Sequence, residues 1–246
     1  MGYWIIKTVL TPLMRLAFRL QVDGAERIPR RGPVIVAANH ISFIDSLFLP
    51  LVLKRRVTFL AKAEYFDNPK TAWFFRMAGQ IPIKREGGSA ADRALASARE
   101  VLADGGMLAL YPEGTRSPDG RLYKGRTGVA RMAIGCDVPV LPVGIIGTAD
   151  AQPVGALVPR PFKRVTIKIG APMHWHELAG RADDPQVLRD VTDDVMDAIA
   201  ALSGQQRVAH YAKKQRVDES APAGAGVAAG AGVGLTAVPS GDVLAD

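Results

Sequence analysis

Cysteine is almost absent from this 246-residue chain, in which Cys136 is the only one. A single thiol cannot form an intramolecular disulfide and cannot build a thiolate metal cluster. We therefore expect a reducing compartment and no bound metal. His174 and His176 stand close to Glu177 in the sequence, but a stable zinc site needs at least three protein ligands. We interpret these two as surface or interface histidines.

Long apolar runs are also missing. The sequence has no stretch of about 20 consecutive apolar residues, so we predict no membrane-spanning helix. Lys7, Arg15 and Arg19 interrupt the apolar N-terminal stretch, and no small-residue cleavage site follows it. We therefore do not expect a cleaved secretory signal.

Acidic residues are too few to balance the basic ones. All 31 Lys and Arg lie within residues 1–216, together with 20 of the 24 Asp and Glu, so this part carries a formal charge of +11. Such a charge favours an anionic partner, which composition alone leaves open as a phospholipid surface, a phosphorylated substrate or nucleic acid. No recognisable RNA- or DNA-binding motif is present, so we expect no nucleic-acid partner.

Residues 3–20 are predicted to form an amphipathic helix. Their polar positions recur every fourth residue and would make a narrow basic stripe opposite a wide apolar face: Lys7, Thr11, Arg15 and Arg19. Such a helix can lie in a bilayer interface or pack on the protein's own core, and both interpretations stay open. Pro12 predicts that it divides into two shorter helices.

The rest of the chain alternates between strand-like and helix-like patterns. Apolar, β-rich runs lie at 33–38, 57–61, 107–111, 138–146 and 165–169. Helical patterns cover 43–53, 70–78, 89–103, 126–135 and 185–202. This order predicts an α/β fold with a mainly parallel sheet flanked by helices. We divide the chain into the N-terminal helical motif, 1–24, one folded domain, 25–216, and a disordered Ala/Gly-rich tail, 217–246.

The most informative segment is 39–45, which follows the first apolar run and opens a helical pattern. Asp45 can accept a hydrogen bond from one imidazole nitrogen of His40, which leaves the other nitrogen free to take a proton. If the acyl donor is already a thioester, a substrate hydroxyl can attack it directly once His40 takes the proton, and no enzyme nucleophile is required. Ser42 and Asp45 also have the spacing of a capping box, so a structural role stays open. Ser42 as a nucleophile is disfavoured, because no Gly-x-Ser-x-Gly elbow is present.

Two further segments contain residues that are candidates for binding the substrate. The piece 79–85 ends in Arg85, whose planar guanidinium suits bidentate binding of a phosphate. In 111–117, Gly114 allows the backbone to approach a ligand, and Glu113 can bind a substrate hydroxyl or hold a neighbouring arginine. Arg116 and Lys124 are further candidates for phosphate binding. Each segment alone is also typical of a solvated arginine or an ordinary glycine turn.

The last segment, 138–143, is an apolar strand with prolines at 139 and 142. Because proline cannot donate to a ladder, we expect this strand to be a sheet edge or the wall of a cleft. An apolar wall suits an acyl chain, and it suits a core strand equally well.

Taken together, the four segments resemble the four motifs of the glycerolipid acyltransferases, the 1-acylglycerol-3-phosphate O-acyltransferase family. The first, His-x4-Asp, matches at His40 and Asp45. The second is similar at 79–85, although Pro82 stands where an aromatic residue is frequent, which puts a local acyl or acceptor contact in doubt. The third matches at 113–117 and the fourth at 138–143. The resemblance covers roughly residues 30–200 and identifies 25–216 as an acyltransferase domain.

The resemblance implies transfer of a fatty acyl group from acyl-CoA or acyl carrier protein to 1-acylglycerol 3-phosphate (lysophosphatidate), giving phosphatidate in phospholipid biosynthesis. It implies His40 and Asp45 as the catalytic pair, binding of the glycerol phosphate by Arg85, Glu113 and Arg116, and no metal or cofactor. We add Gly114, Thr115 and Lys124 from the same segment to the predicted substrate site. The resemblance also implies peripheral or monotopic attachment to a phospholipid surface at the cytoplasmic face of the cell membrane. An acyltransferase for another acceptor, such as a lysophospholipid, glycerol 3-phosphate or a glycolipid, and a non-catalytic basic module are the alternatives.

Overall fold

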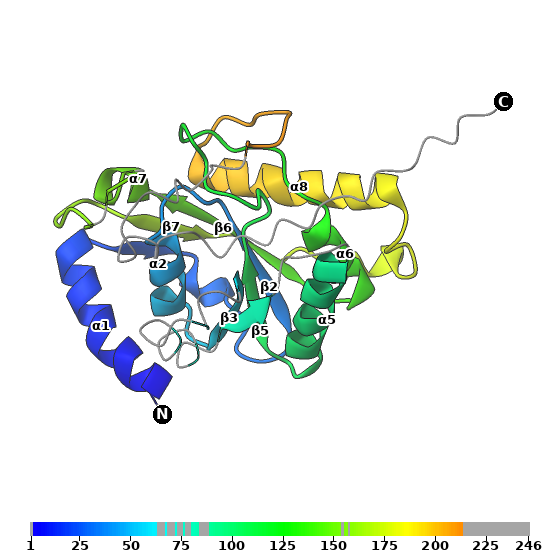
Figure 1. Cartoon of the computed structure of the whole chain (residues 1–246), viewed down its shortest axis with the longest axis horizontal. Coiled ribbons are helices and arrows are strands. Elements are labelled where there is room, and N and C mark those ends of the chain that lie inside the picture. Colours follow the sequence, from blue (N-terminus) through cyan, green and yellow to red (C-terminus); the bar gives the residue numbers. More distant parts are fainter. Residues whose placement is uncertain are drawn as a thin grey trace.

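Strand β2 (Val34–Ala38) lies inside a seven-stranded sheet of order β1-β7-β6-β2-β5-β3-β4 (Figure 1). The computed structural model describes residues 2–62, 67, 72, 76, 80–83, 89–153, 155–156 and 158–213. The other strands are β1 (Gln21–Asp23), β3 (Val57–Lys62), β4 (Ile81–Ile83), β5 (Met107–Leu110), β6 (Val140–Ile146) and β7 (Thr166–Ile169). All neighbours pair in parallel except β6 and β7, which are antiparallel. The predicted α/β fold with a mainly parallel sheet is confirmed.

Helices cover both faces of the sheet, which is why every residue of β2 is apolar and buried. Val34, Val36 and Ala38 face a core cluster that includes α1 (Gly2–Phe18) and α2 (Asp45–Val52). Ile35 and Ala37 face a second cluster, formed with α5 (Ser89–Ala103), α6 (Gly128–Gly135) and α8 (Pro185–Ser203). The alternation along one strand thus supplies both cores.

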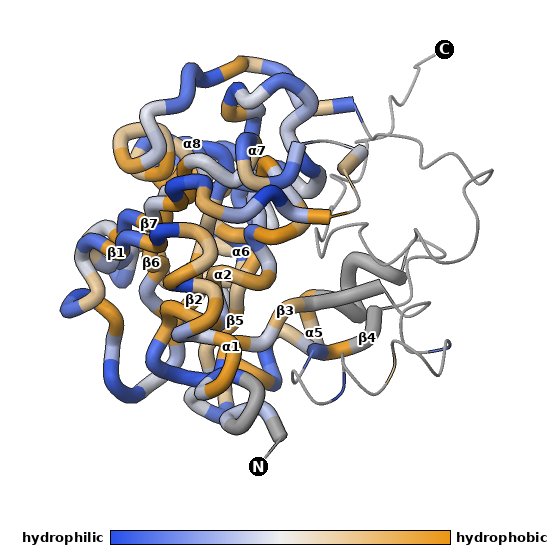
Figure 2. The backbone as a smooth tube through the Cα atoms, turned by 90° about the vertical axis from the view of Figure 1, so that its left-hand side faces the viewer, coloured by the Kyte–Doolittle hydropathy of each residue, from blue (hydrophilic) through white to orange (hydrophobic). Residues whose placement is uncertain are grey.

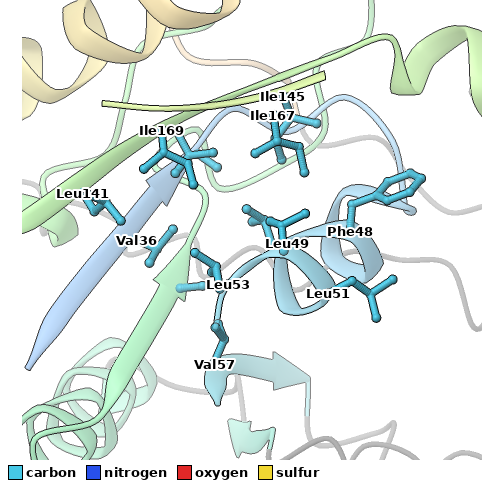
Figure 3. Close-up of a cluster of buried hydrophobic side chains, with 14 of the residues drawn as sticks. Val36, Phe48, Leu49, Leu51, Leu53, Val57, Leu141, Ile145, Ile167 and Ile169 are labelled. Carbon is cyan, nitrogen blue, oxygen red and sulfur yellow. The ribbon is translucent and has the colours of Figure 1, made fainter. Parts of the chain in front are cut away.

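Helix α2 is held over the sheet by its apolar side chains. Figure 3 shows Phe48 and Leu49 of α2 among side chains from four strands: Val36, Val57, Leu141, Ile145, Ile167 and Ile169. Phe48 also meets Phe18 of α1 edge to face, with ring centroids 5.4 Å apart. Full burial of a side chain of this size contributes about 1.5–3 kcal/mol. This packing fixes the first residue of α2, Asp45, close to the end of β2.

Helix α1 is continuous, so the prediction of two shorter helices was wrong. Pro12 lies inside the helix and removes one intrahelical hydrogen bond. Apolar side chains on both sides of Pro12, namely Leu10, Met14 and Phe18, pack on the same core cluster and keep the two halves aligned. The Thr11 hydroxyl, just before the proline, donates to the Lys7 carbonyl oxygen at 2.6 Å.

The opposite side of α1 stays exposed, so the helix packs on the core with only one of its faces. Figure 2, seen from the side of α1, shows hydrophobic residues along this helix. Val9, Leu13 and Leu16 have exposed fractions of 65%, 57% and 76%. Among the helices of the described part, none combines the length and hydropathy needed to cross a bilayer.

Strand β6 is not a sheet edge, which rules out the first of the two positions expected from its prolines; the second, the wall of a cleft, stays a prediction. It lies between β2 and β7. Pro142 accepts a hydrogen bond from the amide of Gly170, immediately after the last residue of β7. Because Pro142 lies opposite the end of β7, its missing N–H does not interrupt the hydrogen bonds between the two strands, and the sheet tolerates the proline.

Several short elements were not predicted: β1, α7 (Thr148–Ala151) and the 3-10 turns Ala25–Arg27 (η1) and His176–Leu178 (η2). The helix predicted at 70–78 lies outside the described residues except for Ala72 and Arg76, which are helical. The tail predicted at 217–246 also lies outside them.

Candidate active site

His40 follows the carboxyl end of β2, and Asp45 begins α2. In open α/β sheets, ligands bind at the carboxyl ends of the parallel strands. The neighbouring strand β5 runs parallel to β2, with Leu110 opposite Ala37, so the residues that follow β5 reach the same edge. The segments 39–45 and 111–117 are brought together in this way.

The imidazole of His40 and the carboxylate of Asp45 form a fully buried pair. Nδ1 of His40 lies 2.9 Å from Oδ2 of Asp45. The same oxygen accepts the amides of Ile41 at 2.7 Å and of Ser42 at 2.8 Å. The bond from the Ser42 amide is one of the two bonds of a capping box, but the second is absent, because the N-cap of α2 is Ile44 and the Ser42 hydroxyl donates to the carbonyl oxygen of Gln152. One carboxylate thus combines the structural role with the orientation of the histidine.

The second imidazole nitrogen of His40 is available. Because Nδ1 faces a carboxylate, it carries the proton of the neutral ring, and Nε2 is then an acceptor. Nε2 is buried and has no hydrogen-bond partner among the described residues. A buried polar atom without a partner commonly marks a place for a ligand or for catalysis. This arrangement suits a general base that removes a proton from a bound hydroxyl.

Tyr111 stacks on His40, a contact that the sequence analysis did not assign. The ring centroids are 3.9 Å apart and the planes are inclined by 10°. The Tyr111 hydroxyl lies 2.9 Å from the hydroxyl of Ser46. Burial, together with the negative charge of Asp45, raises the pKa of Tyr111 well above its usual value, against the opposing hydrogen bond of Ser46. The phenol is therefore neutral, and its ring face covers one side of the imidazole.

The segment 113–117 holds the backbone of His40 at both its donor and its acceptor. Glu113 Oε2 accepts the His40 amide at 3.1 Å, and Oε1 accepts the Tyr123 amide at 2.9 Å. The amide of Ser117 donates to the His40 carbonyl oxygen at 2.7 Å. Burial raises the pKa of Glu113 to about 8, although the amides of Tyr123 and His40 oppose the shift. Both Glu113 oxygens are therefore engaged by the protein.

The remaining predicted ligands lie around the same turn. Gly114 has φ of +73°, a left-handed conformation that favours glycine. Thr115, Arg116 and Lys124 are partly exposed, and no described carboxylate forms an ion pair with either cation. Arg85 lies outside the described residues.

Comparison with known proteins identifies the family of the chain. The profile of the family described as Acyltransferase matches residues 19–146, more than half of the chain. The chain is 30% identical to the chloroplastic 1-acyl-sn-glycerol-3-phosphate acyltransferase of Arabidopsis thaliana over 158 residues, 64% of this chain and 44% of that protein. It is 31% identical to a chloroplastic 1-acyl-sn-glycerol-3-phosphate acyltransferase of Brassica napus, over 56% of this chain and 40% of that protein. The chain thus spans less than half of these relatives.

A solved structure is similar over most of the chain. It is the 1-acyl-sn-glycerophosphate (LPA) acyltransferase PlsC from Thermotoga maritima, with a TM-score of 0.61 and 28% sequence identity. The match covers 80% of this chain and 77% of that one. The part of the chain that matches the family, 19–146, includes His40, Asp45 and the segment 113–117. The resemblance inferred from the four motifs is confirmed, and the chain belongs to the acyltransferase family.

Proposed function

We propose that this protein transfers a fatty acyl group from a thioester donor to the free hydroxyl of 1-acylglycerol 3-phosphate, giving phosphatidate. The observation that carries the proposal is the buried His40, with Nδ1 held by Asp45 and Nε2 without a described partner. The family and the relatives named above support this acceptor. Acyl-CoA or acyl carrier protein is the proposed donor and co-substrate.

His40 acts as the general base in this reaction. Nε2 takes the proton of the acceptor hydroxyl while the hydroxyl oxygen attacks the thioester carbonyl carbon. The tetrahedral intermediate collapses as the carbon–sulfur bond breaks, and the imidazolium returns its proton to the leaving thiolate. Asp45 stabilises the imidazolium between these two steps. No covalent acyl-enzyme is needed, and the Ser42 hydroxyl is engaged with Gln152.

The acceptor phosphate is bound by cations beside the base. Arg116 and Lys124 flank the turn that holds His40, and we assign the phosphate to them together with Arg85. Gly114 and Thr115 belong to the same turn, and we assign them to the substrate site as well. Glu113 contributes through the backbone of His40, since both of its oxygens accept backbone amides. Direct contact between Glu113 and substrate stays a prediction.

A lipid substrate implies work at a membrane surface. The exposed face of α1, with Val9, Leu13 and Leu16, is a suitable element for a bilayer interface. We propose peripheral or monotopic attachment at the cytoplasmic face of the cell membrane. The excess of basic residues favours a surface that contains anionic lipid.

The experiment is thiol release from palmitoyl-CoA and oleoyl-CoA by the purified protein in detergent micelles, with and without lysophosphatidate. We expect release that depends on the acceptor and is lost in His40→Ala. Product analysis should show phosphatidate. Release without acceptor would instead indicate a thioesterase.

A panel of acceptors distinguishes lysophosphatidate from other possible acceptors. Lysophosphatidylcholine, glycerol 3-phosphate and a monoacylglycerol are assayed at equal concentration with the same donor. Preference for any of them over lysophosphatidate would show that the proposed acceptor is wrong, while acyl transfer from the thioester would still hold. Acyl carrier protein charged with the same chain identifies the donor.

A further inference from the structure

A second exposed apolar element lies beside α1, although it is distant in the sequence. In the loop 158–164, which precedes β7, Val158 and Phe162 have exposed fractions of 75% and 67%. Large apolar side chains on adjacent exposed segments are unusual in a soluble surface and mark interaction sites. Figure 1 shows this stretch, coloured green, at the left beside the C-terminal end of α1.

The loop is fixed to α1 by backbone hydrogen bonds. The amide of Phe162 donates to the carbonyl oxygen of Ala17 at 2.5 Å, and the amide of Val165 donates to that of Phe18 at 3.1 Å. These carbonyl groups belong to the last turn of α1, where the helix offers them no partner. The loop therefore caps the helix, and the two elements form one surface.

The backbone at Phe162 is strained. Its φ is +65°, in the left-handed region that an aromatic residue rarely adopts. Such strain persists where surrounding contacts enforce it, and it clusters at functional sites. Here the hydrogen bond to Ala17 holds the strained residue, and the ring is turned to solvent instead of the core.

Unpaired cations surround these apolar side chains. Arg160, Lys163 and Arg164 are exposed on the loop, and Arg15 and Arg19 are exposed at the end of α1. Within the described part of the chain, none of the five forms an ion pair. Apolar side chains flanked by cations complement a bilayer that carries anionic headgroups, where each Lys or Arg strengthens binding roughly fivefold.

The loop is also bonded to a part of the chain that contacts the catalytic segment. Gln152 accepts the hydroxyl of Ser42 at 2.8 Å through its carbonyl oxygen. The amide of Arg160, in the loop, donates to the carbonyl oxygen of Ala151, the residue before Gln152, at 2.6 Å. The loop is thus linked, through Ala151 and Gln152, to Ser42 in the stretch between His40 and Asp45.

We propose that the loop 158–164 is a second membrane-binding element, which inserts Val158 and Phe162 into an anionic bilayer together with the exposed face of α1. The inference rests on the membrane partner proposed above and adds a segment to it. Two attachment points far apart in the sequence fix the orientation of the sheet on the bilayer. The catalytic segment is then held at a set height above the lipid surface.

The test reads insertion of the loop directly. The single native thiol is removed by Cys136→Ala, and Phe162→Cys is labelled with the environment-sensitive fluorophore NBD. Vesicles of phosphatidylcholine with about one third phosphatidylglycerol should raise the emission at least twofold and shift it to the blue. Lipids with a quencher in the acyl chain should reverse the rise. Glu177→Cys, in η2 on the opposite side of Figure 1, is the matched control and should not respond.

Binding of unlabelled protein to the same vesicles provides the second measurement. Phe162→Ser should weaken vesicle binding about tenfold, and Lys163→Glu with Arg164→Glu should weaken it at least as much at low salt. Vesicle binding with neither insertion at 162 nor an effect of these variants would overturn the inference and leave acyl transfer untouched. A dimer in sedimentation that Phe162→Ser abolishes would identify a second copy of the chain as the occupant and would also overturn it.

The assay in detergent micelles separates this inference from the proposed reaction. Insertion of the loop without acyl transfer to any acceptor would reject the reaction and keep the membrane element. Acyl transfer in micelles by a protein that binds no vesicles would reject the membrane element alone.

Discussion

The imidazole of His40 lies flat against the phenol ring of Tyr111, with centroids 3.9 Å apart and planes inclined by 10°. The contact links the two segments that follow β2 and β5, and the Tyr111 hydroxyl continues it to Ser46 of α2. The phenol therefore keeps the imidazole in the plane that directs Nδ1 at Asp45. Tyr111 acts through His40 and is a positioning residue.

Replacement of Tyr111 should affect turnover through the ring and much less through the hydroxyl. A stacked aromatic pair contributes about 0.5–1.5 kcal/mol beyond burial, so Tyr111→Leu should lower kcat by up to roughly tenfold with little change in KM. Tyr111→Phe keeps the stack, loses the bond to Ser46 and should retain most of the activity. Steady-state kinetics with thermal unfolding as a folding control measure both. Equal loss in the two variants would assign the effect to the hydroxyl.

Asp45→Asn should lower kcat by about 10²–10⁴-fold, because the imidazole loses both its fixed tautomer and the charge that stabilises the imidazolium. Binding of the acceptor should persist, and calorimetry on the variant can measure it. Ser42→Ala is the comparison, since it removes the bond to Gln152 and keeps the amide donors to Asp45. Near-complete loss of activity in Ser42→Ala would instead support Ser42 as a nucleophile that forms an acyl-enzyme.

The buried Glu113 should make the protein less stable as the pH rises. Its pKa is raised from 4.5 to about 8 in the folded chain. Between these values the folded state holds a proton that the unfolded state has released, so the free energy of unfolding falls by up to about 1.4 kcal/mol per pH unit. Below pH 4.5 the stabilisation of the folded state by the protonated Glu113 is fully present. Urea unfolding at pH 5, 6, 7 and 8 gives the free energy of unfolding at each pH. This free energy should fall less steeply with pH in Glu113→Gln than in the parent, and an equally steep fall would contradict the raised pKa of Glu113.

Arg116→Ala and Lys124→Ala should weaken binding of phosphate-bearing acceptors. A hydrogen bond to a charged group contributes about 1.5–3 kcal/mol, which corresponds to roughly a tenfold to hundredfold higher KM for lysophosphatidate. Activity toward a monoacylglycerol should change little, because it lacks the phosphate. Arg131→Ala, on α6 and paired with Asp183, is the control cation. Equal losses toward both acceptors would remove these residues from the phosphate site.

Gly144 should not tolerate a side chain, because β6 and α8 approach each other closely there. A Cβ atom at this position would lie 2.7 Å from backbone atoms of Leu202 and Ser203. We expect Gly144→Ala to destabilise the fold by about 1–3 kcal/mol. In Gly135→Ala the nearest atoms would be 3.6 and 3.7 Å away, an ordinary contact, so its stability should match that of the parent. Chemical denaturation of both variants gives the comparison.

The sequence predicted the elements whose apolar pattern reflects burial. Strand β2 is buried on both faces and appears as a continuous apolar run, and α8 shows a regular amphipathic pattern. Strand β1 was missed because it has only three residues, of which only Val22 packs against the core. The interior position of β6 was missed because the prolines were weighed without the end of β7, a partner from a later part of the chain.

In the candidate site, the spacing of residues along the sequence predicted the contact between His40 and Asp45. It did not predict the contacts between residues of different segments. His40 and Asp45 are five residues apart, so their hydrogen bond follows from one turn of chain. The stack of Tyr111 depends on the register of β2 with β5, and the second oxygen of Glu113 is engaged by Tyr123, ten residues further on. An aromatic residue that ends a strand next to the strand of a candidate base is a signal that could have indicated the stack. The role of Arg85 stays a prediction, because it lies outside the described residues.

One oxygen of Asp45 accepts the imidazole of His40 and the amides of Ile41 and Ser42. The start of α2 and the aim of the proposed base are therefore the same set of bonds. Opening of this turn, which leads into α2, would release the imidazole while the sheet below stays intact. Heat inactivation should accordingly follow the local opening of residues 41–45 and precede global melting, so sequence changes that strengthen the beginning of α2 would prolong the working life of the enzyme.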